Sequence, residues 1–429
     1  MSSIRIPKRF FPIAGFVLLT AVLLARIVYV VSRIDVSSTL RFLPLEYQNR
    51  AMQLLSGTPS SFPEAWGFFY IPLAMFYGFI DLLGLSEVRV EAFLTVQAVM
   101  GSLSVVFCYL LTRRICNKTA SLLIAFTAAL YYPLLYTHTL ILSESLFTFL
   151  FLGFLLLLLR KQQSFASSVA LGNLFALLLI VRPVFLSSIP FLLLWTLVYH
   201  RSAVWKNKLP IAAGLGSMAL TLFIAGTLNA SISTHHRFTL AGNGGVNVAM
   251  TQCQFSRLEY NLPDGSDSFW FSPPAYQGSE HESKMTEVPF SDQGYYLRLG
   301  AACLAEHPER LVENFKNIWH IYDSTFYPDL NSPSYHQDLL NFWRWIAIGA
   351  TLLFFLFPLV WTRSERRIYL LFCGLVLSLY AIMYIGNPGE ERYLVPYFFL
   401  LLPHAALTLV RGMHTIKPWL PTLITIETK

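Results

Sequence analysis

The sequence predicts an all-α polytopic membrane protein with about ten transmembrane helices, and three observations lead to this fold class. Only 13% of the 429 residues are charged, against about 25% in an average soluble domain. The mean hydropathy is +0.53. Apolar runs as long as the roughly 20 residues that a spanning helix needs recur along much of the chain. These figures exclude a disordered chain, a coiled coil and an ordinary soluble enzyme, and the unbroken runs exclude an outer-membrane barrel.

Ten apolar runs are the predicted spans. The first is too long for a cleaved signal peptide, and no small-residue cleavage site follows it. An eleventh run, 66–84, contains Pro72 and has acidic residues at its ends, which is typical of a helix that lies in the membrane interface. The ten predicted spans are 10–32, 91–111, 119–137, 140–159, 165–181, 183–200, 209–230, 341–362, 367–385 and 393–411.

The basic residues predict how these spans are oriented. If 66–84 lies in the interface, every basic cluster falls on one side of the membrane, and the positive-inside rule assigns that side to the cytoplasm. Both termini are then cytoplasmic. Because topology explains the net charge of +7, no nucleic-acid partner is predicted. The clusters are Arg5/Lys8/Arg9, Arg113/Arg114/Lys118, Arg160/Lys161, Arg201/Lys206/Lys208, Arg363/Arg366/Arg367 and Arg411/Lys417.

Two long segments are predicted on the external side. The first external loop, 33–90, contains a short amphipathic helix at Leu45–Leu55 that Gly57 can end. The second is net acidic and turns helical at about 292–320, which predicts a folded extracytoplasmic lobe of mixed structure. The chain thus divides into a transmembrane core at 1–230, the lobe at 231–340, and C-terminal spans with a cytoplasmic tail at 341–429.

The cysteines give one further expectation about the lobe. Cys253 and Cys303 are the only cysteines in the predicted external segments. A disulfide and two free thiols are both open, because spacing alone does not fix a distance. The five cysteines lack metal-ligand spacing, so no zinc module is predicted.

Ionisable residues at the ends of the predicted spans gather on the external side. Such residues are costly near lipid and point to function, although each one alone can simply anchor a helix. Carboxylates together with arginines suit a reaction on a lipid phosphate, because arginine binds phosphate with a planar fork and a carboxylate can deprotonate a hydroxyl. No Gly-rich nucleotide loop is present. The residues are Asp35, Glu46, His138, Glu144, Arg182 and Arg392.

Four stretches resemble motifs of one family. They are Glu46-Tyr47 with Ala51, Leu54, Leu55 and Gly57; Tyr70-Ile71-Pro72-Leu73; Leu179-Ile180-Val181-Arg182-Pro183; and Arg392-Tyr393-Leu394-Val395-Pro396. In this order the chain resembles the GT-C superfamily of membrane glycosyltransferases, in particular the bacterial relatives of protein O-mannosyltransferases and lipid A aminoarabinose transferases. The resemblance covers roughly 10–200 and 290–411 and does not extend to 240–290.

The resemblance implies an activity and a location. A GT-C enzyme takes a sugar from a polyprenyl-phosphate donor and passes it, with inversion, to an acceptor on the external face of the bacterial inner membrane. The acceptor can be lipopolysaccharide, another glycolipid, a wall glycan or a protein. No cofactor follows from this chemistry, and a divalent metal is compatible with it but not required.

The resemblance also implies roles for individual residues. The family's base is an acidic residue in the first external loop, but Leu43 occupies the usual position here, which leaves Glu46 and Asp35 as the candidates. Glu144 falls where relatives keep an acidic residue near the acceptor. The predicted substrate-binding residues are Arg392, Tyr393, Arg182, His138 and Tyr47, with the arginines on the donor phosphate.

Two other functions remain open at this point. A polysaccharide polymerase or ligase is a chemical neighbour that uses a similar lipid-linked donor. A transporter or flippase is a different class, but such proteins have repeated halves and charges near mid-membrane, whereas this chain shows no repeat and has its charges at one side.

The topology predicts the outcome of reporter fusions. A reporter fused at about residue 86 should be external and one at about residue 116 cytoplasmic, because all basic clusters then lie inside. Paired alkaline phosphatase and green fluorescent protein fusions measure this. An external reporter at 116 would mean that 66–84 spans the membrane, and the ten-span topology would be wrong.

Overall fold

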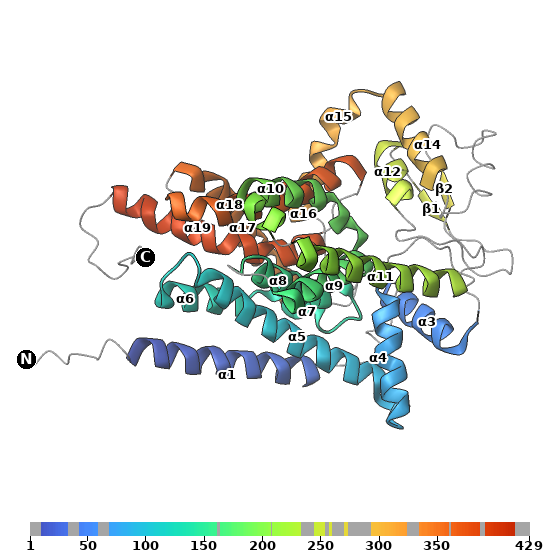
Figure 1. Cartoon of the computed structure of the whole chain (residues 1–429), viewed down its shortest axis with the longest axis horizontal. Coiled ribbons are helices and arrows are strands. Elements are labelled where there is room, and N and C mark those ends of the chain that lie inside the picture. The colour runs from blue at the N-terminus through green and yellow to red at the C-terminus, as the bar shows by residue number, and fades with distance from the viewer. Residues whose placement is uncertain are drawn as a thin grey trace, which may run out of the picture.

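The computed structural model describes residues 10–32, 43–58, 68–160, 164–206, 208–232, 244–253, 257–259, 270–272, 293–323, 334–359, 362–386 and 391–416 (Figure 1). Nearly all of these residues are helical, in agreement with the predicted all-α class. The first half contains α1 (Phe10–Ser32), α3 (Leu43–Ser56), α4 (Tyr70–Leu82), η1 (Ser86–Val88), α5 (Arg89–Thr112), α6 (Lys118–Ala129), α7 (Tyr132–Thr137), α8 (Ser143–Leu158), α9 (Phe165–Val181), η2 (Pro183–Ser188), α10 (Ile189–Lys206) and α11 (Lys208–Ile232).

The second half contains further helices and one pair of strands. They are α12 (Gly244–Cys253), β1 (Arg257–Glu259), β2 (Trp270–Ser272), α14 (Gln293–Glu306), α15 (Arg310–Glu313), α16 (Phe315–Asp323), α17 (Ser334–Leu356), η4 (Phe357–Leu359), α18 (Arg363–Gly386), η5 (Glu391–Tyr393) and α19 (Val395–Ile416). The strands pair antiparallel, with Arg257 opposite Ser272.

Among the residues that the structure describes, six helical stretches are long and apolar enough to cross a membrane. They are Gly15–Ser32, Ser86–Thr112, Leu209–Ser231, Asp338–Leu359, Glu365–Gly386 and Val395–Gly412. The other predicted spans correspond to shorter apolar helices, among them Lys118–Ala129, Ser143–Leu158 and Phe165–Val181. The protein is therefore a helical membrane protein, and the count of ten spans remains a prediction.

One predicted span is not a continuous helix. The run 119–137 is divided into α6, which ends at Ala129, and α7, which has Pro133 in its first turn. Proline has no N–H to donate to the carbonyl four residues earlier, that of Ala129, and its ring clashes with that carbonyl, so α6 cannot continue into α7. Arg26 of α1, which is buried, donates from Nη1 to the carbonyl oxygen of Ala129. It thereby satisfies a carbonyl at the helix end that has no partner within the helix.

The helices of the first external loop agree with the sequence. The predicted helix at Leu45–Leu55 is confirmed as α3, and Gly57 follows it with a φ of +67° that suits glycine. Helix α4 has 13 residues and is about 20 Å long, whereas the hydrocarbon core is about 30 Å thick. It also runs crosswise to α1 and α5 in Figure 1. These features fit the predicted interfacial helix.

The two ends of the bundle differ. We call the end where α1, α9 and α18 finish and α8 and α19 begin the lobe end, because α12 and α14 lie beside it (Figure 1). We call the opposite end the basic end. There Glu365 accepts from both terminal nitrogens of Arg411, at 2.8 Å and 2.5 Å, and joins α18 to α19. Arg114 likewise donates to carbonyl oxygens of α8 and the residue after it.

Aromatic packing joins α8, η2 and α19 beneath the lobe end. The ring of Phe185 lies 5.7 Å from that of Phe147 and 5.6 Å from that of Phe151, and Phe151 lies 5.4 Å from Tyr397. All four rings are buried. Contacts of this kind stabilise beyond the burial of area and fix the relative positions of the segments that carry them.

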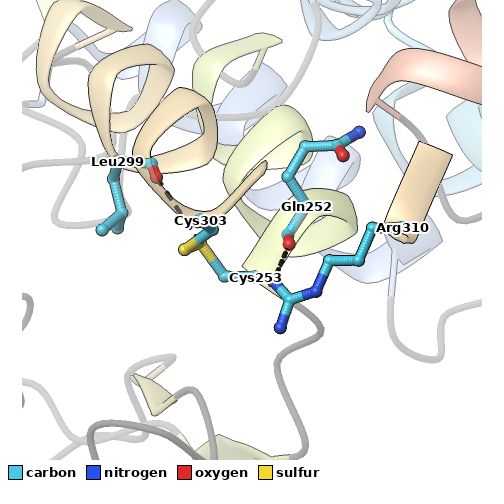
Figure 2. Close-up of a disulfide and its surroundings, with 5 residues drawn as sticks. All are labelled: Gln252, Cys253, Leu299, Cys303 and Arg310. Carbon is cyan, nitrogen blue, oxygen red and sulfur yellow. Dashed lines mark hydrogen bonds between the residues drawn. A yellow bond between two sulfur atoms is a disulfide. The ribbon is translucent and has the colours of Figure 1, made fainter. Parts of the chain in front are cut away.

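A disulfide joins two helices of the lobe. Cys253 at the end of α12 is bonded to Cys303 of α14, so the alternative that the sequence leaves open is decided in favour of the disulfide (Figure 2). The bond closes a loop across 50 residues of sequence, which in the chain-entropy description stabilises the fold by about 4 kcal/mol. The helical segment predicted at about 292–320 is also confirmed, as α14, α15 and α16.

Candidate functional site

Three charged side chains from distant parts of the chain meet at the lobe end. Glu144 lies in the first turn of α8, Arg182 follows the last residue of α9, and Arg392 lies in η5. Oε1 of Glu144 pairs with Nη2 of Arg182 and lies 3.7 Å from Nε of Arg392. The three residues are 0%, 6% and 8% exposed. The sequence predicts each residue at this side of the membrane, and the structure brings them into contact.

Local structure explains how Arg182 reaches Glu144. Pro183 disfavours helical backbone at Arg182, whose φ of −144° and ψ of 95° are extended. The side chain thus leaves the helix axis, and its Nε donates to Oγ of Ser143 at 3.1 Å. Ser143 and Glu144 therefore contact the same guanidinium from the start of α8. A carboxylate in the first turn is also favoured by the helix dipole.

Tyr393 packs against both arginines. Its ring centroid lies 4.6 Å from the guanidinium carbon of Arg182 and 5.5 Å from that of Arg392. The ring of Phe147 contributes a second face for Arg182 at 5.8 Å. Cation–π contacts of this kind are worth roughly 0.5–2 kcal/mol each. They stabilise two like charges close to each other.

Two guanidinium groups share one carboxylate in this cluster, because Arg182 and Arg392 both lie beside Oε1 of Glu144. Oε2 of Glu144 is buried and has no hydrogen-bond partner among the described residues. A guanidinium group binds oxygen acceptors with a planar fork, so two of them side by side are suited to an anion such as a phosphate.

His138 does not join this cluster. Its ring lies directly against Gly101 of α5, and neither ring nitrogen has a hydrogen-bond partner among the described residues. Burial lowers the pKa of His138 well below its usual range, and the charge of Arg26 adds to the shift, so the ring is neutral near pH 7. The geometry gives His138 a packing role beside the turn that leads into α8.

Among the residues predicted in the first external loop, the structure describes the side chain of Tyr47 but not those of Glu46 and Asp35. Tyr47 is buried in α3, with its ring 5.0 Å from that of Phe69. Glu46 also lies in α3, but its side chain is outside the described residues, as is Asp35. The choice between these two carboxylates as the base therefore stays a prediction.

Several contacts around these segments were not predicted from the sequence. Tyr70 donates to Oδ1 of Asn229 at 2.5 Å and joins α4 to α11, and Arg50 lies 5.9 Å from the same tyrosine ring. The contacts of Ser143 with Arg182 and of Gly101 with His138 were not predicted either. Ser143 could have been identified from the sequence, because it precedes a carboxylate at the start of a helix. A single glycine in an apolar run gives no such indication.

Among the residues that the structure describes, no group of three or more His, Cys, Asp or Glu side chains could hold a metal ion. Comparison with known proteins gives no match to any protein-family model, curated protein or solved structure. The geometry of the cluster and the sequence motifs therefore carry the functional interpretation.

The contact between Gly101 and His138 predicts a coupled pair of mutations. Gly101→Ala would place a methyl group in the space of the imidazole and should lower the free energy of unfolding by about 1–3 kcal/mol. In Gly101→Ala/His138→Ala the clash is gone, so the double mutant should lose less than the sum of the single losses. Thermal unfolding in detergent measures this.

Gly216→Ala on α11 is the control, because a methyl group there meets no atom within 4 Å. It should be neutral or slightly stabilising. Additive losses in the double mutant would contradict the packing role of His138.

Proposed function

We propose that this protein is an inverting glycosyltransferase of the GT-C type that moves a sugar from a polyprenyl-phosphate donor to an acceptor outside the cytoplasm. The observation that carries the proposal is the buried cluster of Arg182 and Arg392 around Glu144 at one end of an apolar bundle. A lipid-linked phosphate can reach this depth from the membrane, and the planar forks of the two arginines would bind its oxygen atoms.

The reaction follows from the charge that develops on the leaving group. A base takes the proton of the acceptor hydroxyl, the hydroxyl oxygen attacks the anomeric carbon from the opposite side, and the bond to the phosphate oxygen breaks. The polyprenyl phosphate leaves with the electron pair and gains negative charge. Arg182 and Arg392 would stabilise that charge, and they are held in place before the reaction, so little reorganisation is needed.

The geometry favours Glu144 as the group that orients the arginines. Its Oε1 already accepts from Arg182 and lies beside Arg392, so a second role in taking a proton would break the contact that holds the site together. We therefore assign the base to Glu46 or Asp35 in the first external loop, as the family resemblance implies.

Two observations support an external location for the cluster. Disulfides persist in oxidising compartments, and Cys253–Cys303 belongs to the lobe beside this end of the bundle. Described basic clusters such as Arg113/Arg114 and Arg366/Arg367 lie at the opposite end, as expected for the cytoplasmic side. Together with the ten predicted spans, these features favour a multi-pass protein of the bacterial inner membrane whose site opens to the outside.

The alternatives differ in how well the geometry suits them. A polysaccharide polymerase or ligase would use the same anion site and differs only in its acceptor, which can be a glycolipid, a wall glycan, lipopolysaccharide or a protein. A transporter is less well supported, because the described charges gather at the two ends of the bundle. A reconstituted assay with undecaprenyl-phosphate sugars separates these classes, since a transporter forms no glycosidic bond.

Arg392 should matter for turnover of the lipid-phosphate donor. A partly desolvated, charge-assisted contact is worth about 1.5–3 kcal/mol, so Arg392→Ala should reduce the transfer rate by roughly tenfold to a hundredfold. Arg392→Lys should recover only part of this, because lysine keeps the charge but loses the planar fork. The measurement is transfer from undecaprenyl-phosphate sugars in proteoliposomes.

Glu391→Gln is the control for Arg392, since it removes a neighbouring carboxylate and keeps the arginine. Glu391 has no part in the proposed phosphate contact, so this variant should stay close to wild type. A loss below about threefold in Arg392→Ala, or an equal loss in Glu391→Gln, would refute the phosphate contact.

The base should lie in the first external loop. We expect Glu46→Gln or Asp35→Asn to reduce transfer by about a hundredfold to ten-thousandfold with expression unchanged, because a general base contributes that much. Asp81→Asn is the matched control, a carboxylate of the same loop that pairs with Arg89 at 3.4 Å near the surface. If both Glu46→Gln and Asp35→Asn keep wild-type rates, the base assignment is wrong and Glu144 becomes the candidate.

A further inference from the structure

Helices α15 and α16 carry an apolar stripe on the surface of the molecule. Leu311, Val312, Phe315 and Trp319 are 45%, 74%, 63% and 53% exposed. Their spacing of three and four residues places them along one side of the nearly continuous segment 310–323. Large exposed apolar patches mark a surface that another molecule or the membrane covers.

The opposite side of this segment is fixed to the protein by polar contacts. Asn314, which is buried, donates to Oε1 of Gln252 at 3.0 Å, and Arg310 donates to the main-chain oxygen of Gln252 (Figure 2). Gln252 in turn donates to the carbonyl oxygen of Ile385, at the end of α18, at 2.6 Å. Because Gln252 adjoins the disulfide at Cys253, the segment has one orientation, with its apolar stripe outward.

The apolar stripe continues onto a predicted membrane-spanning helix. The ring of Phe315 lies 5.1 Å from that of Tyr384 of α18, whose hydroxyl donates to the carbonyl oxygen of Leu311 at 2.5 Å. The next residue, Ile385, is 51% exposed and lies in the candidate span Glu365–Gly386. Lipid that covers Ile385 on α18 can therefore extend onto the adjoining stripe.

We propose that the stripe of α15 and α16 lies in the membrane interface at the lobe end, with bilayer lipid as its partner. Continuity with α18 favours lipid over a second copy of the chain. The composition agrees, because tryptophan and tyrosine are enriched at the interface, and exposed Lys316 lies at the edge of the stripe, where its ammonium group can reach the headgroups. An interfacial helix buries its apolar face about 5–10 Å into the boundary.

This contact has a consequence for the candidate site. Helix α16 packs against η5, the short helix that carries Arg392. The lipid-bound segment therefore supports η5, the short helix before α19. The proposal of membrane contact does not depend on the glycosyltransferase activity, since it concerns only which solvent meets the stripe.

Spin-label accessibility in nanodiscs tests the proposal on the full chain. Labels at Val312→Cys, Phe315→Cys and Trp319→Cys should collide more with oxygen than with a water-soluble nickel chelate, and should report a depth of about 5–10 Å below the headgroups. Leu352→Cys, 62% exposed in α17, is the lipid control. Arg298→Cys, exposed on α14, is the water control and should show the opposite ratio.

Each outcome of this experiment decides the proposal. Nickel accessibility at 312, 315 and 319 equal to that at 298 would overturn it, because the stripe would face water. Low accessibility to both reagents would overturn it as well, since the stripe would then be covered by protein, either a second copy or another part of the chain. Labels are placed at three positions so that the test can still be interpreted if one variant does not fold.

Discussion

The buried contact between Glu144 and Arg182 is the interaction on which the lobe end of the bundle depends. Both groups lie among apolar helices, so removal of either would leave a buried charge at a cost of about 3–5 kcal/mol. The contact holds the start of α8 against the end of α9. Because Arg392 lies beside the same carboxylate, this contact also positions η5, the short helix before α19. The interaction therefore selects the arrangement of three segments that apolar packing alone would leave less well defined.

The sequence predicted the members of this cluster because ionisable residues are rare in apolar runs. Glu144, Arg182 and Arg392 are conspicuous for that reason, and the alternation of spans places them on one side. Their mutual contacts could not be predicted, since they join residues far apart in the chain. The same distinction holds for the fold. The helix α3 and its end at Gly57 follow from local signals, whereas the bond between Tyr70 and Asn229 depends on tertiary packing.

The sequence interpretation was incomplete where the high hydropathy of a whole run concealed a break in the helix. The run 119–137 is uniformly apolar, yet Pro133 divides it into α6 and α7. In the lobe, helix α12 begins with two glycines and is joined to α14 by the disulfide, an arrangement that was not predicted from the sequence. Hydropathy reports which segments avoid water, but it does not report breaks in the backbone or bonds between distant residues. The break between α6 and α7 and the disulfide at α12 were therefore found only in the structure.

The two charged clusters at opposite ends of the bundle differ in a way that bears on function. At the basic end one carboxylate, Glu365, meets one guanidinium, Arg411, through two hydrogen bonds, so the charges balance within the pair. At the lobe end one carboxylate, Glu144, meets two guanidinium groups. A balanced pair is sufficient to join two helices. Two planar guanidinium groups side by side can in addition hold the oxygen atoms of a phosphate, which is the role that we propose for Arg182 and Arg392.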